Sequence, residues 1–327
     1  MAGRLRRLLA RDPTAGLEER LTWIWGSPRS GSSWLLQLLA DPLDVEFDAP
    51  LGFSPSPRAP EPSPALVPID ELLFASHLVP WDGEPAEMLG EWWPGSVNGY
   101  CHVRPGYFLS DAYAEIWRPG MRRLLLERVQ AVVDRARAAV PALPARPDVV
   151  LKETPSGHGA DQVMSLLPRS RALLLNRDPR DVVDSLLHAF QPGGFMAVQY
   201  GKAYATADER AEGAAWAAKL WAMSTDVGSA ALARHDPALG RAVRYEDLLA
   251  DTAGGLSSLL EWIGIEREPE AVMATVERRS FAQAAESGDL RRTRSARPGR
   301  WRESLSEREV EIVTAIAGER ITRLGYD

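Results

Sequence analysis

The feature that most constrains the fold lies between Leu21 and Leu39, where a buried strand runs through a serine-rich turn directly into a helix. Leu21–Gly26 alternates aromatic and β-branched residues, as a buried strand does, and Leu35–Leu39 has helical character. A helix N-terminus carries a partial charge of roughly +0.5, so a turn of this kind favours an anion. We therefore expect an anion-binding turn at this point of the chain.

Further strand and helix patterns follow along the chain. Strands are predicted at Asp148–Leu151, Arg171–Leu175 and Arg241–Tyr245, and helices at Arg118–Val140, from Asp178, at about Asp251–Ile263 and from Ser306 to about Gly325. Strands that alternate with helices predict an α/β fold with a parallel sheet flanked by helices. Ser54–Pro68 is too rich in proline for a helix and is predicted to be a surface loop. We find no internal repeat and expect residues 1–327 to form a single domain.

Composition excludes several classes of function. The formal net charge is −7 and the only cysteine is Cys101, while the five histidines are scattered. Wholesale binding to a nucleic acid, an internal disulfide and a metal site are therefore not expected. No apolar run approaches the length of a membrane span, and the N-terminus lacks the apolar core of a signal peptide. We expect a cytoplasmic protein.

The turn after the first strand offers three kinds of anion-binding group. Its backbone amides and three serine hydroxyls are hydrogen-bond donors, Arg29 adds a charge, and Gly26 and Gly31 permit sharp bends. The alternative is a serine-rich turn that only caps a helix, but the preceding strand and the arginine favour an anion site. A nucleotide-hydrolysing P-loop would need a Gly-Lys-Ser/Thr ending, which is missing here.

A second candidate segment is NRDPRDVVDSLLHAF, residues 176–190. Arg177 stands at a strand end, and Ser185 lies two helical turns into the next helix on the same side. Both side chains could reach one phosphate. The alternative is that Arg177 pairs with Asp181 and that Ser185 faces solvent.

A third candidate segment is the basic run RRTRSARPGRWRES, residues 291–304, with six arginines around Gly299 and Trp301. It could be a solvated charge run or a nucleic-acid patch. The acidic balance of the whole chain argues against the second, and a loop that folds over a bound polyanionic ligand fits better.

Together the three segments resemble the sulfotransferase family, which transfers a sulfuryl group from 3′-phosphoadenosine-5′-phosphosulfate. GSPRSGSSW (26–34) resembles the family's 5′-phosphosulfate loop, with arginine where cytosolic members have lysine. RDPRDVVDS (177–185) resembles its 3′-phosphate motif, and RSARPGRW (294–301) its basic glycine-tryptophan motif. The resemblance covers about residues 21–305. It implies a P-loop-like three-layer fold, this sulfo-donor as co-substrate, adenosine 3′,5′-bisphosphate as product, and no metal.

The resemblance assigns donor-binding roles to matching positions. It gives the 5′-phosphosulfate to Arg29, Ser30, Gly31, Ser32 and Ser33, the adenine to Trp34, Tyr245 and Phe281, and the 3′-phosphate to Arg177, Ser185, Arg297 and Gly299. Tyr245 and Phe281 could equally be core residues. Arg279 departs from the threonine that cytosolic members place before the aromatic residue.

Sulfuryl transfer is an in-line reaction that depends on positioning and charge. Arg29 and Lys152 are the cations that we expect to stabilise the leaving group. The histidine base of cytosolic members is absent from its usual place in LKETPSGHG (151–159). Our candidates for the base are, in order, Glu153, Asp48 and His158, and Glu153 has a rival role as an ion-pair partner of Lys152.

The acceptor is expected to contact Asp70–Tyr113, within a loop-rich insertion over residues 54–113, and Phe190–Ala205. The aromatic residues there favour a small hydroxylated acceptor such as a phenol, a lipid or a glycosylated natural product, and glycans also stack on tryptophan. Two alternative functions stay open: a non-catalytic protein that binds adenosine bisphosphate or another phosphorylated ligand, and a P-loop kinase.

Overall fold

The central element of the fold is a five-stranded sheet in which all neighbouring strands are parallel, in the order β4-β5-β1-β6-β7. The computed structural model describes residues 14–45, 52–55, 63–72, 111–154, 157–281 and 297–326. The strands are β4 (Leu66–Asp70), β5 (Asp148–Lys152), β1 (Leu21–Gly26), β6 (Arg171–Asn176) and β7 (Gly240–Arg244). A separate antiparallel pair joins β2 (Leu43–Val45) to β3 (Phe53–Pro55).

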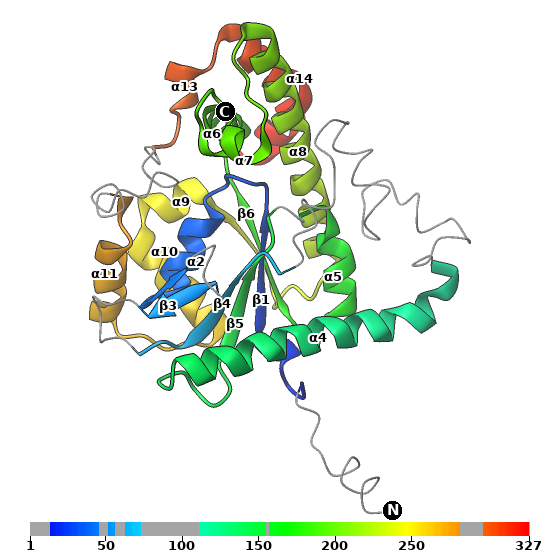
Figure 1. The fold of residues 1–327 in the computed structure, drawn as a ribbon, viewed down its shortest axis with the longest axis vertical. Coiled ribbons are helices and arrows are strands. Elements are labelled where there is room, and N and C mark those ends of the chain that lie inside the picture. Colours follow the sequence, from blue (N-terminus) through cyan, green and yellow to red (C-terminus); the bar gives the residue numbers. More distant parts are fainter. Residues whose placement is uncertain are drawn as a thin grey trace, which may run out of the picture.

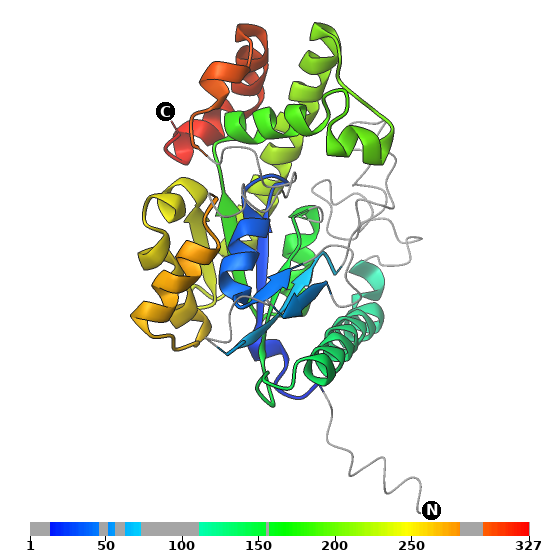
Figure 2. The same ribbon diagram turned by 60° about the vertical axis from the view of Figure 1, so that its left-hand side comes forward.

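Helices cover both faces of this sheet, which confirms the predicted three-layer α/β fold (Figures 1 and 2). One face is covered by α4 (Ala114–Ala139), α5 (Ala160–Leu166) and α8 (Ala207–Arg234), and the other by α2 (Ser32–Ala40), α9 (Tyr245–Ala250), α10 (Thr252–Ile263) and α11 (Pro269–Arg278). The alternation of β1 explains the two layers: Trp23 and Trp25 belong to the first core, and Ile24 to the second. Every side chain of β1 is therefore buried.

A third group of helices lies beyond the carboxyl ends of the strands, at the top of Figure 1. It consists of α6 (Pro179–Ala189), α7 (Phe195–Tyr200), α13 (Trp301–Ser304) and α14 (Glu307–Arg323), which share a core with the outer part of α8. Asp178 caps α6 with Pro179 at its first position, and Ser306 forms a capping box with Glu309 at the start of α14, both as predicted.

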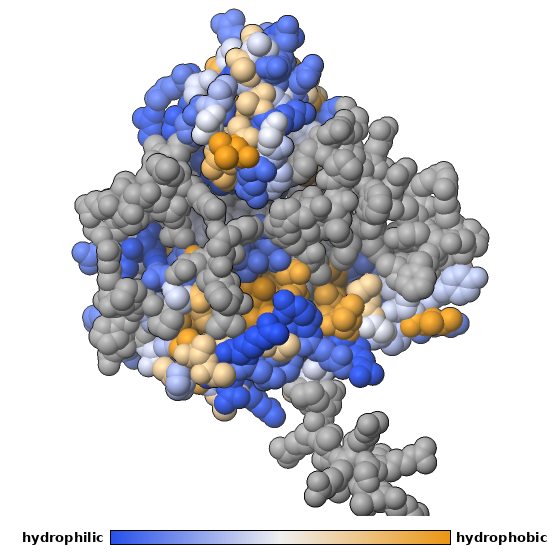
Figure 3. Space-filling model, viewed as in Figure 1, coloured by the Kyte–Doolittle hydropathy of each residue, from blue (hydrophilic) through white to orange (hydrophobic). Residues whose placement is uncertain are grey.

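The helix predicted at Arg118–Val140 is part of α4, which is amphipathic. Leu125, Val129 and Val132 are buried against the sheet, and Figure 3 shows a run of hydrophilic side chains across the outward side of this helix, bordered by apolar ones.

Two predictions of secondary structure were wrong in part. Ser54–Pro68 was predicted to be a loop, but Leu66–Asp70 forms β4, which pairs with β5 from Leu66 opposite Asp148 to Asp70 opposite Lys152. β4 is an edge strand, where a proline such as Pro68 can be accommodated because one side of the strand needs no ladder hydrogen bond. Tyr245, predicted to end a strand, instead begins α9.

The turn between β1 and α2 is pressed against its neighbours. Gly26 has a φ of 152°, and a Cβ atom there would lie 2.5 Å from the carbonyl oxygen of Leu175 in β6. Gly31 has a φ of 95°, and a Cβ atom there would lie 2.5 Å from the ring of Tyr245. Arg29 also adopts a positive φ, of 68°. The path of this turn therefore needs glycine at both of its bends.

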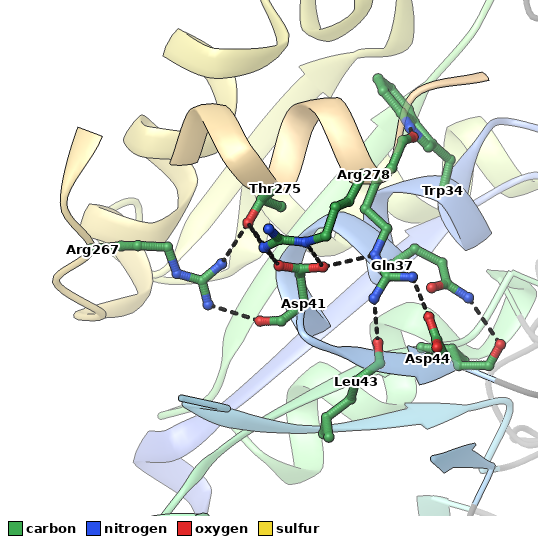
Figure 4. Close-up of polar contacts among 10 residues, drawn as sticks. Trp34, Gln37, Asp41, Leu43, Asp44, Arg267, Thr275 and Arg278 are labelled. Carbon is green, nitrogen blue, oxygen red and sulfur yellow. Dashed lines mark hydrogen bonds and ion pairs between the residues drawn. The ribbon is translucent and has the colours of Figure 1, made fainter. Parts of the chain in front are cut away.

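A buried carboxylate joins α11 to the end of α2, as Figure 4 shows. Asp41 has no exposed surface, pairs with Arg278 and Arg279, and accepts a hydrogen bond of 2.8 Å from the hydroxyl of Thr275. Arg267 adds a hydrogen bond of 3.0 Å to the Asp41 carbonyl oxygen. Burial alone would raise the pKa of the Asp41 carboxyl, but these contacts hold it below its usual value.

Gly31→Ala tests the contact between the turn and Tyr245. Gly16 is a matched control, because it has a φ of 72° and a methyl group added there would have no other atom within 4 Å. Both variants strain the backbone, but only Gly31→Ala adds an overlap, which costs about 1–3 kcal/mol. We expect Gly31→Ala to lower the free energy of unfolding in urea by that much more than Gly16→Ala. Equal losses would contradict the close contact.

Asp41→Asn should lower the free energy of unfolding by about 3–5 kcal/mol, because it leaves two arginines without their buried carboxylate. The control is Asp226→Asn: Asp226 also pairs with two arginines, Arg320 and Arg323, but its side chain is 36% exposed. That change should cost about 0–1 kcal/mol.

The pH dependence of the free energy of unfolding, compared between the parent and Asp41→Asn, is a second test of the Asp41 contacts. Because the pKa of Asp41 is lowered in the folded protein, its stabilisation is present above the unfolded value of about 3.9 and is lost as the pH falls through the folded pKa. Asp41→Asn should flatten this part of the stability profile. An unchanged acid limb in the variant would assign the loss to other carboxylates.

Candidate active site

The candidate site lies where the carboxyl ends of β1, β5 and β6 meet. β1 lies between the other two, and the chain adds strands β4 and β5 on one side of it and β6 and β7 on the other. In open parallel sheets, ligands bind at such a switch point, outside the carboxyl ends of the strands. The turn after β1, the Lys152–Glu153 pair after β5 and Arg177 after β6 all lie at this edge.

The structure brings Arg29, Arg177 and Ser185 together. The Arg29 Nε donates a hydrogen bond of 3.1 Å to Ser185 Oγ, and Arg177 Nη1 donates one of 3.2 Å to the carbonyl oxygen of Arg29. The guanidinium of Arg29 also lies 5.5 Å from the ring centroid of Phe195 in α7. Two arginines and a hydroxyl from three parts of the chain are therefore linked at this edge of the sheet.

The serines of the turn differ in their surroundings. Ser30 and Ser32 are buried, whereas Ser33 is exposed and accepts a hydrogen bond of 3.4 Å from Lys152 Nζ. The first helical hydrogen bond of α2 runs from the Leu35 amide to the Gly31 carbonyl oxygen. The amides of residues 31–34 therefore have no acceptor inside the helix and are oriented for an anion at its N-terminus.

Three aromatic residues gather beside this turn. Trp34 lies 5.1 Å from Phe281 and 5.8 Å from Tyr245 between ring centroids. The guanidinium of Arg177 lies over the ring of Tyr245, 4.4 Å from its centroid. Trp34 and Phe281 are half-buried, but Tyr245 is almost fully buried, and burial raises its pKa to about 12. Tyr245 thus packs in the core as well as bordering the site.

The indole of Trp34 is held by the Asp41 network. Trp34 Nε1 donates a hydrogen bond of 3.0 Å to the carbonyl oxygen of Arg279, whose guanidinium pairs with Asp41 and Asp44 (Figure 4). The sequence showed Arg279 only as a departure from the family's threonine. Its function in the structure is to fix the end of α11 beside Trp34.

The C-terminal basic segment is attached to α6 through two carboxylates. Asp181 accepts hydrogen bonds from the amides of Gly299, at 2.7 Å, and Trp301, at 3.1 Å, and Asp184 accepts one of 2.6 Å from Ser304. Asp181 thus binds this segment, where the sequence had offered it as a partner of Arg177. Burial raises the pKa of Asp181, against the effect of these amides. Gly299 is therefore attached to the same helix that carries Ser185.

Arg297 lies on the surface at the start of the described part of this segment, where it pairs with Glu303. Its expected contact with a 3′-phosphate stays a prediction.

The candidate catalytic residues after β5 are buried. Glu153 has no exposed surface, and its amide donates a hydrogen bond of 3.0 Å to the carbonyl oxygen of Ile24 in β1. Lys152 is 4% exposed and pairs with Asp70 at 2.6 Å and Glu71 at 2.8 Å. Although burial by itself lowers the pKa of Lys152, the two carboxylates raise it above its usual value.

Sequence reasoning missed this acidic pair. The sequence had placed Asp70 and Glu71 only at the start of the segment expected to contact the acceptor. The pairing of β4 with β5 brings their carboxylates to Lys152. Two further candidate bases came from the sequence. His158 lies in the short helix η4 (Gly157–Gly159), and Asp48 lies outside the described residues.

The two acceptor segments are only partly described. Of Asp70–Tyr113, residues 73–110 lie outside the described part. In Phe190–Ala205, Phe190 packs on Tyr200 at 6.1 Å and on Tyr204 at 5.5 Å between ring centroids, so some of its aromatics form core. Within the described ranges, no three His, Cys, Asp or Glu residues are grouped to hold a metal, and no helix is long and apolar enough to cross a membrane.

Solved structures with some likeness to this chain are known at low sequence identity. Solved structures that resemble the chain include mouse sulfotransferase SULT7A1 complexed with PAP, at 10% identity over 95% of this chain and 90% of that one, with a TM-score of 0.47. Retinol dehydratase in complex with androsterone and inactive cofactor PAP is 16% identical, covers 93% of this chain and 81% of its own, and gives a TM-score of 0.40. The sulfotransferase domain from the curacin biosynthetic pathway is 17% identical, covers 90% of this chain and 96% of its own, and also gives a TM-score of 0.40.

No curated protein sequence matches the chain. A family model described as "Sulfotransferase family", however, matches residues 22–269 of this chain of 327 residues. This match includes the turn after β1, the Lys152–Glu153 pair and the segment from Arg177 to Ser185. Since it spans well over half of the chain, the protein belongs to the sulfotransferase family.

Proposed function

We propose that this protein transfers a sulfuryl group from 3′-phosphoadenosine-5′-phosphosulfate to a hydroxyl of a small-molecule, lipid or glycan acceptor. The observation that carries the proposal is the convergence of Arg29, Arg177 and Ser185 at the N-terminus of α2. Two cations, a hydroxyl and the helix amides suit a ligand with two separate anionic groups.

The residues present fit the donor in its charge and in its aromatic part. The amides of residues 31–34 and the Arg29 guanidinium would hold the 5′-phosphosulfate, and Arg177 and Ser185 the 3′-phosphate. Trp34 and Phe281, both half-buried beside the turn, would border the adenine. The segment at Gly299, held on α6 by Asp181, lies on the same helix as Ser185 and could add contacts to the 3′-phosphate.

Such a site would promote the reaction mainly through charge and position. In sulfuryl transfer negative charge grows on the oxygen that leaves sulfur, and Arg29 together with the helix N-terminus would stabilise it. The contribution of Lys152 is reduced because Asp70 and Glu71 already balance its charge. Arg29 is therefore the cation to which we assign the larger effect.

The direct test is to incubate the protein with the sulfo-donor and a panel of phenols, lipid alcohols and glycosides, and to follow sulfonated product by mass spectrometry. Product formed together with adenosine 3′,5′-bisphosphate would support the proposal. Tight binding of the bisphosphate without product from any acceptor would instead favour the non-catalytic binding protein. Magnesium-dependent turnover of ATP would point to a kinase.

Arg177→Ala and Arg29→Ala should each weaken binding of adenosine 3′,5′-bisphosphate by roughly 10- to 100-fold, since a hydrogen bond to a charged group contributes about 1.5–3 kcal/mol. Both should also abolish most turnover. Isothermal titration and the product assay check the two effects.

A matched control for these variants is Arg123→Ala, because Arg123 pairs with Glu127 on the exposed side of α4. It should leave both affinity and turnover unchanged. If Arg177→Ala and Arg29→Ala bound the bisphosphate as tightly as this control, the assignment of the site would be wrong.

A further inference from the structure

Glu71 occupies an unusual position at the edge of the candidate site. It follows the last residue of β4, and its amide donates a hydrogen bond of 2.9 Å to the carbonyl oxygen of Lys152, which continues the strand pairing by one residue. Its φ is 60°, a value that residues with a side chain adopt uncommonly. Strain of this kind is often found at functional sites.

The strained backbone has a consequence for the direction of the side chain. In an extended strand, successive side chains point to opposite faces of the sheet. Asp70 and Glu71 are successive, yet both carboxylates contact the Nζ of Lys152, at 2.6 and 2.8 Å. The positive φ therefore turns Glu71 back toward the carboxyl end of β5.

Glu71 thereby lies between the donor side and the acceptor side of the site. Lys152 links Glu71 to the donor side, because the Lys152 Nζ that pairs with Glu71 also donates a hydrogen bond of 3.4 Å to Ser33 Oγ in the first turn of α2. The charge of Glu71 also acts on Tyr200 at the end of α7, in the segment expected to contact the acceptor. Burial raises the pKa of Tyr200, and the nearby charge of Glu71 raises it further.

Accessibility separates Glu71 from Glu153, the first candidate base from the sequence. Glu153 has no exposed surface, so an acceptor can contact its carboxylate only after the chain around it rearranges. The Glu71 side chain is 11% exposed and needs no such change. Asp70 is similarly exposed, at 13%, and serves as the comparison for experiment.

We propose that Glu71 is the general base that removes the proton from the acceptor hydroxyl, an inference that rests on the proposed sulfuryl transfer. As the acceptor oxygen forms its bond to sulfur, its O–H bond breaks and the proton passes to a carboxylate oxygen of Glu71. The bond from sulfur to the bridging oxygen breaks, and its electron pair stays on the 5′-phosphate of the departing adenosine bisphosphate.

The charges around Glu71 suit this role. Burial raises the pKa of its carboxyl, Lys152 opposes this rise and Asp70 adds to it, so the pKa stays above its usual value. The groups that face it in the described residues are Asp70 on β4, Lys152 on β5 and Tyr200 on α7. A carboxylate with a raised pKa accepts a proton more readily than an ordinary one. Turnover should therefore fall as the pH drops through that pKa.

The test compares Glu71→Gln with Asp70→Asn and Glu153→Gln, using an acceptor from the panel. Each glutamine or asparagine keeps the size of the side chain, and Glu71→Gln leaves Lys152 paired with Asp70. Because a positioned base contributes about 10²–10⁴-fold, Glu71→Gln should lower kcat by that factor and remove the acidic limb of the pH profile. Its affinity for adenosine 3′,5′-bisphosphate should stay within about threefold of the parent, and Asp70→Asn should keep the acidic limb.

Glu71→Asp covers the case in which the glutamine variant does not fold. It retains the charge beside Lys152 but withdraws the carboxylate, so kcat should fall at least about tenfold while the acidic limb remains. The proposal is overturned if Glu71→Gln or Glu71→Asp has the kcat of the parent, or if Glu153→Gln is the variant that loses the acidic limb. If the parent itself binds the bisphosphate but yields no product with any acceptor, the proposed function fails before the variants are compared, and the role of Glu71 fails with it.

Discussion

Arg177 reaches from the end of β6 to the backbone carbonyl of Arg29 in the turn after β1, and the rest of the candidate site depends on this contact. It brings two arginines together, with Ser185 bound to the guanidinium of Arg29 and Tyr245 packed against that of Arg177. Like charges held together in this way favour a bound anion. The parallel order of the strands makes the arrangement possible, because it places both carboxyl ends at one edge of the sheet.

Carboxylates then attach the flanking segments to this edge. Asp41 holds the end of α11, just before Phe281 and the Arg279 carbonyl group that binds Trp34. Asp181 holds the segment of Gly299 on α6. Both carboxylates are buried, and both bind groups that lie far from them in sequence. An acidic chain can therefore build a basic site, because Asp41 and Asp181 attach the segments around the site while Arg29 and Arg177 lie at its centre.

Local patterns predicted the central part of the fold, and they gave most of the residues of the candidate site. The alternation in Leu21–Gly26, the Asp178–Pro179 start of α6 and the spacing of Arg177 and Ser185 depend on neighbours in the chain, which a sequence displays directly. β4 was missed because it follows a proline-rich stretch that is typical of a loop, and its own Pro68 is tolerated because β4 lies at the sheet edge. Glu71 and Arg279 were missed for a related reason. Their partners, Lys152 and Asp41, are distant in sequence and become neighbours only through strand pairing and helix packing.

The most direct measurement of the central claim is a comparison of two ligands on two proteins. Titrating the parent and Arg177→Ala with adenosine 3′,5′-bisphosphate and with adenosine 5′-monophosphate isolates the energy of the 3′-phosphate. The account predicts that the parent prefers the bisphosphate by roughly 10- to 100-fold, and that Arg177→Ala loses most of this preference. Equal affinity of the parent for both ligands, or an undiminished preference in Arg177→Ala, would contradict it.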